Sequence, residues 1–183
     1  MRKLKSILLY TALGLLANAA AAQSVDLADL RDGDMRKLTI LSDPIAGSDV
    51  LFTSEDGGDL TLADFNGQYV LLNFWATWCA PCRKEMPALS ALQTELGNEN
   101  FQVVTVATGR NPRPAMEAFF KEIGVDNLPL HTDARQAFSR SMGVLGLPVT
   151  LIIDPEGNEI ARLQGDADWH SESAVAILTA LTR

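Results

Sequence analysis

The pattern of apolar and polar residues is clearest in the middle of the chain, where it predicts a strand followed directly by a helix. Residues 69–75 are rich in branched and aromatic residues and follow Asn66 and Gly67, a pattern that predicts a buried strand after a turn. Beyond residue 82 the apolar side chains recur at spacings of three and four until Gly97, which predicts an amphipathic helix that ends there.

The segment before this unit predicts a β-hairpin. Residues 50–53 and 59–62 are strand-like and are separated by Glu55-Asp56-Gly57-Gly58, which is typical of a turn. Residues 23–43 are polar and mixed, and we assign them no more than the status of a lead-in segment.

The segment after the unit predicts further strands and helices in alternation. The expected strands cover residues 101–107, 149–153 and 159–163, with a short extended piece at 128–131; the expected helices open at Asn111-Pro112, at Asp133 and at Ser171. The run 149–153 is apolar throughout, which predicts a central strand buried on both faces. This order favours an α/β fold in which helices flank both faces of one mixed sheet.

The first residues have the form of an export signal. A positively charged start is followed by an uncharged stretch from Ser6 to Ala22, and the final alanines fit a cleavage site before Gln23. An uncleaved membrane anchor is the alternative, because a stretch of this length reaches the lower limit for a spanning helix. We expect the rest of the chain to lie outside the cytoplasm, in the periplasm, where an uncleaved anchor would hold it at the inner membrane.

These boundaries divide the chain into three parts. Residues 1–22 are the signal peptide or anchor, 23–43 the lead-in segment and 44–183 one globular domain. The net charge of −8 predicts no basic face, so nucleic acid is not an expected partner. We expect a monomer.

The candidate chemistry lies at the junction of the first strand and helix, where both cysteines of the chain stand two residues apart. Cys79 is placed near the N-cap of the helix, where free N–H groups and the helix dipole stabilise a thiolate. A thiolate is the form that attacks disulfides. Cys82 lies one turn further in and is suited to resolve the mixed disulfide, so the pair is predicted to be a redox disulfide.

Two other interpretations of the cysteine pair are weaker. As a structural staple it would close a loop of about four residues and contribute only roughly 2 kcal/mol. As half of a zinc site it would need two further ligands, and His131 and His170 are far apart without a paired pattern. We therefore expect neither a metal nor a cofactor.

Two motifs carry a resemblance to a known family. The segment 73–87, Asn-Phe-Trp-Ala-Thr-Trp-Cys-Ala-Pro-Cys-Arg-Lys-Glu-Met-Pro, and the segment 146–154, Gly-Leu-Pro-Val-Thr-Leu-Ile-Ile-Asp, resemble the TlpA/ResA family of exported thioredoxin-like thiol–disulfide oxidoreductases. The match extends over roughly residues 44–183. The resemblance implies a thioredoxin fold with an N-terminal β-hairpin addition.

The resemblance also implies roles for residues around the cysteines. Pro148 would be a cis-proline beside the pair, and a substrate segment would bind along the backbone of Leu147. Trp78 would form part of the docking surface.

A further role concerns proton transfer. Thioredoxins carry an aspartate at the position of Asn73, which cannot titrate, whereas ResA-like proteins have a glutamate at the position of Glu85. Glu85 is therefore a candidate catalytic residue that exchanges protons with Cys79 and Cys82. The alternative is a solvated carboxylate on the surface of the first helical turn.

The expected function is a periplasmic reductase of protein disulfides. In the family, the substrates are proteins with paired cysteines, either apocytochromes c awaiting haem or copper-site proteins of terminal oxidases, and a membrane electron donor reduces the pair again. The alternatives are a DsbA-type thiol oxidase and a non-catalytic copper-binding assembly factor, although the latter would favour a wider cysteine spacing and a histidine ligand.

Overall fold

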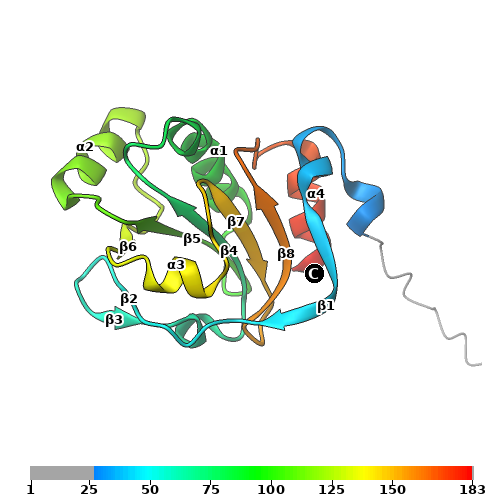
Figure 1. The fold of residues 1–183 in the computed structure, drawn as a ribbon. Coiled ribbons are helices and arrows are strands. Elements are labelled where there is room, and N and C mark those ends of the chain that lie inside the picture. The colour runs from blue at the N-terminus through cyan, green and yellow to red at the C-terminus, as the bar shows by residue number, and fades with distance from the viewer. Residues whose placement is uncertain (1–26, 183) are drawn as a thin grey trace, which may run out of the picture.

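The structure, a computed structural model, describes residues 27–182, and its centre is one mixed sheet of eight strands (Figure 1). The strands are β1 (Thr39–Ala46), β2 (Phe52–Thr53), β3 (Asp59–Leu60), β4 (Tyr69–Trp75), β5 (Phe101–Thr108), β6 (His131–Asp133), β7 (Val149–Ile153) and β8 (Asn158–Gln164). Their order in the sheet is β1-β8-β7-β4-β5-β6-β2-β3. The central strand β4 pairs in parallel with β5 and antiparallel with β7, so the expected mixed sheet is confirmed.

Helices cover both faces of the sheet, as expected for a thioredoxin fold (Figure 1). They are α1 (Ala80–Leu96), α2 (Arg113–Ile123), α3 (Ala137–Ser141) and α4 (Glu172–Leu181). Three 3₁₀ turns precede α1 in the chain: η1 (Leu27–Leu30), η2 (Gly33–Lys37) and η3 (Leu62–Phe65). The expected export signal, residues 1–22, lies outside the described residues. Among the helices that are described, none has both the length and the apolar character needed to cross a membrane.

The alternation of side chains along β4 creates two hydrophobic cores. Leu71 and Trp75 point into the core shared with α1, α2 and α4, whereas Leu72 and Phe74 point into the core shared with α3 and the hairpin. Asn73 lies between Leu71 and Trp75 in this alternation, so it faces the α1 side of the sheet. This places a polar residue beneath the helix that carries the cysteines.

The most clearly patterned elements lie where the sequence predicts them. The predicted limits of β4, α1 and β7 agree with the structure, and every residue of β7 is buried. The β2–β3 hairpin is also present and antiparallel, although each strand is shorter than predicted. Strong periodicity and full burial thus made these elements predictable.

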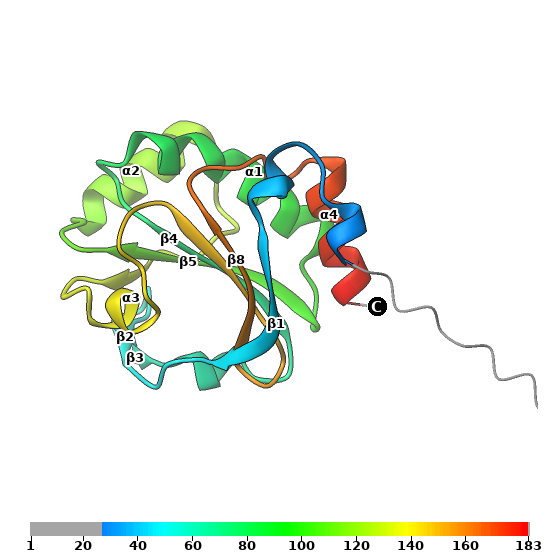
Figure 2. The same ribbon diagram turned by 45° about the vertical axis from the view of Figure 1, so that its right-hand side comes forward.

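The lead-in segment contains structure that its polar sequence does not predict. β1 pairs antiparallel with β8 at the edge of the sheet, and most of its residues are exposed, so no alternation of buried and exposed positions marks it. Before it, η1 and η2 lie against α4 (Figure 2), and Met35 and Leu38 are fully buried there.

Two predicted helix starts are displaced. The N-cap of α2 is Pro112 rather than Asn111, whose side chain has partners elsewhere. Asp133 is the last residue of β6, and α3 begins only at Ala137. The Asp133 carboxylate nevertheless accepts the N–H groups of Ala137 at 2.9 Å and Ser139 at 2.8 Å, so it satisfies the start of α3 from outside the helix.

Candidate functional site

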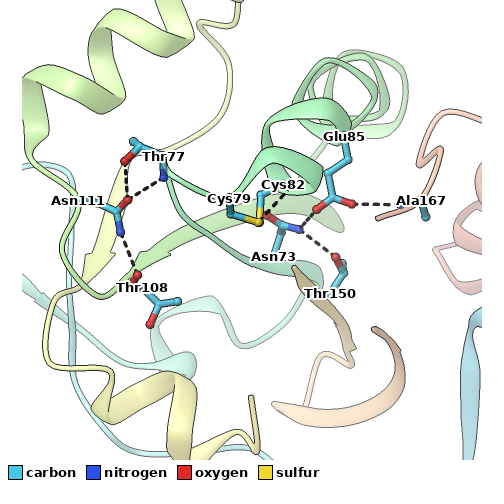
Figure 3. Close-up of a disulfide and its surroundings, with 9 residues drawn as sticks. All are labelled: Asn73, Thr77, Cys79, Cys82, Glu85, Thr108, Asn111, Thr150 and Ala167. Atoms are coloured by element: carbon cyan, nitrogen blue, oxygen red, sulfur yellow. Dashed lines mark hydrogen bonds between the residues drawn. A yellow bond between two sulfur atoms is a disulfide. The ribbon is translucent and has the colours of Figure 1, made fainter. Parts of the chain in front are cut away.

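The two cysteines form a disulfide at the start of α1, directly after β4 (Figure 3). Cys79 is the N-cap residue, and its Sγ accepts the backbone N–H of Cys82 at 3.3 Å. The exposed fraction is 6% for Cys79 and 0% for Cys82. A partner in solution can therefore reach the pair only through Cys79.

Asn111 holds the loop that leads into the cysteines. Its Oδ1 accepts the backbone N–H of Thr77 at 2.8 Å and the Thr77 hydroxyl at 3.0 Å, and its Nδ2 donates to the carbonyl of Thr108 at 2.9 Å (Figure 3). These bonds join the end of β5 to the segment before Cys79. The sequence predicted Asn111 as a helix cap, since an asparagine before a proline is typical of a helix start. Nothing in the local sequence indicates a contact with Thr77, which is 34 positions away.

Glu85 lies one helical turn after Cys82 and is buried, with 2% of its surface exposed. Its Oε1 accepts Asn73 Nδ2 at 2.8 Å, and its Oε2 accepts the backbone N–H of Ala167 at 3.2 Å. Asn73 Nδ2 also donates to Thr150 Oγ1 at 2.9 Å (Figure 3). The interpretation of Glu85 as a solvated surface carboxylate is therefore wrong.

Burial changes the acidity of this carboxyl group. Removal from water raises the pKa of Glu85 from 4.5 to about 7, even though hydrogen bonds from Asn73 and Ala167 and the nearby Trp169 indole lower it. The negative charge of Asp166 raises the pKa further. Both protonation states of Glu85 are therefore accessible near neutral pH, as a group that exchanges protons requires.

The amide of Asn73 lies between the disulfide and the Glu85 carboxylate in Figure 3. Its Nδ2 donates two hydrogen bonds, whereas its Oδ1 is buried without a hydrogen-bond partner in the described part of the chain. Asn73 thus orients Glu85 without adding a second charge beneath the cysteines.

The other predicted site residues gather at the same end of the sheet. The Leu147–Pro148 peptide bond is cis. Phe74 pairs with Val149, so the start of β7 lies beside the end of β4, where the cysteine segment begins. Trp78 and Leu147 both line a surface cavity of about 390 Å³, and the Trp78 side chain is 65% exposed.

The remaining wall of this cavity comes from segments that the sequence analysis did not connect with the site. The cavity is lined by Trp78, Thr108, Gln136, Ser139, Arg140, Val144, Leu145, Gly146 and Leu147. Leu145 is 97% exposed, so an apolar side chain stands at the rim together with Trp78. We refer to this cavity as the Trp78 groove.

Both histidines have structural partners. His131 Nδ1 accepts the backbone N–H of Glu55 at 3.0 Å, and His170 Nε2 lies 2.7 Å from a carboxylate oxygen of Glu95. Within residues 27–182, no group of three or more histidine, cysteine, aspartate or glutamate side chains is placed to hold a metal ion.

Comparison with known proteins gives one family and several relatives. The Redoxin family model matches residues 21–178. The thiol–disulfide oxidoreductase ResA of Bacillus subtilis (strain 168) is 35% identical over 116 residues, which cover 62% of this chain and 64% of that protein. The alignment with it therefore spans less than two thirds of that relative's length.

A second relative and one solved structure extend the comparison. ResA of Geobacillus kaustophilus is 31% identical over 130 residues, which cover 68% of this chain and 74% of that protein. The crystal structure of a thiol:disulfide interchange protein DsbE from Chlorobium tepidum has a TM-score of 0.66 and 27% identity, and the superposition covers 77% of this chain and 99% of that one.

Proposed function

This chain belongs to the Redoxin family, and from that premise we propose that it is a thiol–disulfide oxidoreductase that reduces disulfides in other proteins. The observation that carries the proposal is the Cys79–Cys82 disulfide at the N-terminus of α1, with only Cys79 reachable from solvent. The similarity to proteins named as ResA thiol–disulfide oxidoreductases supports the same activity.

The reaction begins from the reduced protein. The Cys79 thiolate attacks a substrate disulfide, forms a mixed disulfide and releases one substrate thiolate. Cys82 then gives its proton to the Glu85 carboxylate, and its sulfur attacks the Cys79 sulfur. This second exchange forms the Cys79–Cys82 disulfide and releases the other substrate thiolate. Two electrons pass to the substrate, the released thiolates take protons from solvent, and Glu85 returns its proton to solvent.

The Trp78 groove is where we place the substrate segment. The exposed Trp78 and Leu145 offer apolar contacts, and the backbone of Leu147 beside Pro148 offers hydrogen bonds to an extended chain. The substrate class that follows is a protein with two cysteines close together, such as an apocytochrome c or a copper-site protein of an oxidase.

The wider setting of the reaction is also part of the proposal. The export signal expected in residues 1–22 would deliver the domain to the periplasm, where disulfides persist. A membrane electron donor would then return the Cys79–Cys82 pair to the dithiol after each turnover.

Replacement of Cys82 by serine tests the proposed function. Cys82→Ser removes the thiol that resolves the mixed disulfide but keeps Cys79 at the helix start. We expect this variant, produced in the exporting cell, to accumulate covalent complexes with its substrates. Non-reducing electrophoresis followed by mass spectrometry would detect them, and reduction would release the partner.

Cys79→Ser is the matched control, because it leaves one cysteine in place but removes the accessible one. It should trap at least tenfold less protein, roughly the loss expected when the attacking group is absent. Trapping of a haem-attachment protein or of a copper-site protein would identify the client. Absence of trapped protein with both variants would contradict the proposed function.

A further inference from the structure

Glu85 also faces a cavity on the side away from the disulfide. This cavity, of about 310 Å³, lies between α1 and the loop that joins β8 to α4, and its lining includes Glu85, Asp34, Lys84, Asp166 and Asp168. The cavity beside the buried carboxylate is thus lined by charged groups from three separate parts of the chain. One of them, Asp34, belongs to the lead-in segment, to which the sequence analysis assigned no role.

Charged groups on and beside the cavity wall form one connected network. Lys84 Nζ lies 3.0 Å from Asp166 Oδ2, and Lys37 Nζ lies 2.8 Å from Asp34 Oδ1. Lys37 Nζ also donates to the carbonyl of Asp166 at 2.7 Å, and Asp34 Oδ2 accepts the N–H of Asp168 at 3.1 Å. Three of these contacts tie α1 and η2 to the same loop on both sides of Ala167.

The position of this loop matters because Ala167 donates its N–H to Glu85 Oε2. That hydrogen bond favours the ionised carboxylate. The charged side chains of the network are partly exposed, so each ion pair by itself contributes little to stability. Their common effect is to hold Ala167 against Glu85 and to fix two opposite charges, Lys84 and Asp166, near it.

We propose that η2, through Lys37 and Asp34, and the Lys84–Asp166 pair act together as a positioning device that sets how tightly Glu85 holds its proton. The inference rests on the proposed role of Glu85 in proton exchange. The other described groups beside Glu85 are neutral: Asn73 of β4 and Trp169 of the loop, with Thr150 of β7 behind Asn73. The Asp168 carboxylate also lines the cavity, where it accepts the N–H of His170. The charged groups of the network are therefore the ones that change the proton affinity of Glu85.

Three substitutions have effects of different sign. Asp166→Asn removes a negative charge near Glu85 and keeps the main-chain carbonyl that Lys37 binds, so the pKa of Glu85 should fall. Lys84→Met leaves the Asp166 charge without its partner, so the pKa should rise. Lys37→Met releases the loop that presents the Ala167 N–H, so the pKa should also rise.

Carbon-13 NMR of the oxidised protein, with the side-chain carboxyl carbon of glutamate labelled, measures these effects directly. Glu85→Gln identifies the resonance by its loss. We expect the titration midpoint to move by about half a pH unit, to lower pH in Asp166→Asn and to higher pH in the two lysine variants. Arg36→Met is the matched control, because Arg36 also lies in η2 but pairs with exposed Asp32, and its midpoint should equal that of the wild type.

The opposite directions of the midpoint shifts distinguish an electrostatic effect from general loosening of the structure, because loosening would move all midpoints the same way. Midpoints that all equal that of Arg36→Met, or that all move in one direction, would overturn the inference. Neither result would affect the trapping by Cys82→Ser, so failure of this inference and failure of the proposed function are distinguishable.

Discussion

At the scale of single residues, burial has its largest chemical consequence at Glu85. The motif that contains it is compatible with an exposed carboxylate near the start of a helix, and the local sequence contains nothing that buries it. The residues that cover it, Asn73 and Ala167, come from a strand before the helix and a loop 82 positions further along the chain. Its proton affinity is therefore a property of the folded state.

This burial predicts a dependence of stability on pH. The pKa of Glu85 is about 7 in the folded protein and near its ordinary value of 4.5 in the unfolded chain. Between these values the folded state binds a proton that the unfolded state has lost, so the free energy of unfolding falls as pH rises. The loss approaches about 3 kcal/mol above pH 7, at about 1.4 kcal/mol per unit.

Glu85→Gln should remove this loss. In urea denaturation, we expect the variant to gain about 3 kcal/mol relative to the wild type between about pH 4 and about pH 8. Glu99→Gln, at an exposed glutamate, should show no such gain. Parallel pH profiles for the wild type and Glu85→Gln would contradict the burial-induced pKa.

At the scale of elements, α1 determines how strongly the Cys79 thiolate is stabilised. The helix start favours the thiolate, since Cys79 is the N-cap. The cations next in sequence are occupied: Arg83 lies 3.6 Å from Glu122 and over the ring of Phe119, and Lys84 pairs with Asp166. Glu85, when ionised, opposes a second negative charge on Cys79, which lies six residues before it. The stabilisation of the thiolate is therefore modest.

A modestly stabilised thiolate favours a reducing pair. We expect a midpoint potential close to that of thioredoxin, which is about −270 mV. Only a strongly stabilised reduced form raises the potential toward that of DsbA, which is about −120 mV. Equilibration with glutathione or dithiothreitol buffers, read by thiol alkylation, gives the value. A midpoint near the DsbA value would replace the proposed reductase with the alternative thiol oxidase.

At the scale of the whole molecule, the Trp78 groove exists only because distant segments meet. Its walls come from the loop before α1, from the end of β5, from α3 with its N-cap and from residues 144–147 before β7. Hydrophobic periodicity could not predict it, since its two most exposed apolar side chains, Trp78 and Leu145, lie in loops outside any regular pattern.

Trp78→Ala tests the groove as a docking surface. Because exposed tryptophans at interfaces contribute strongly to binding, we expect about a tenfold lower rate with a protein disulfide substrate. The rate with dithiothreitol, which needs no docking surface, should be unchanged. Leu51→Ala is the matched control, since Leu51 is 55% exposed but does not line the groove, and its rates should equal those of the wild type. Equal losses in both variants would contradict the assignment.

Local sequence patterns were enough to predict the parts of this protein in which every residue carries the same signal. The apolar runs of β4 and β7 and the periodicity of α1 predicted these elements within their observed limits, because burial of a whole strand or of one helix face marks every residue involved. The placement of Cys79 at a helix start followed from the same pattern. The resemblance of two motifs added the thioredoxin fold and the cis-proline.

Features that depend on contacts between distant segments could be seen only once the chain was folded. The exposed edge strand β1 has no periodicity to mark it, and Asn111 binds Thr77 instead of capping its own helix. The burial of Glu85 and the network from η2 that surrounds it likewise join residues far apart along the chain. A carboxylate acquires a perturbed pKa through desolvation and neighbouring charges, and both are set by packing in three dimensions.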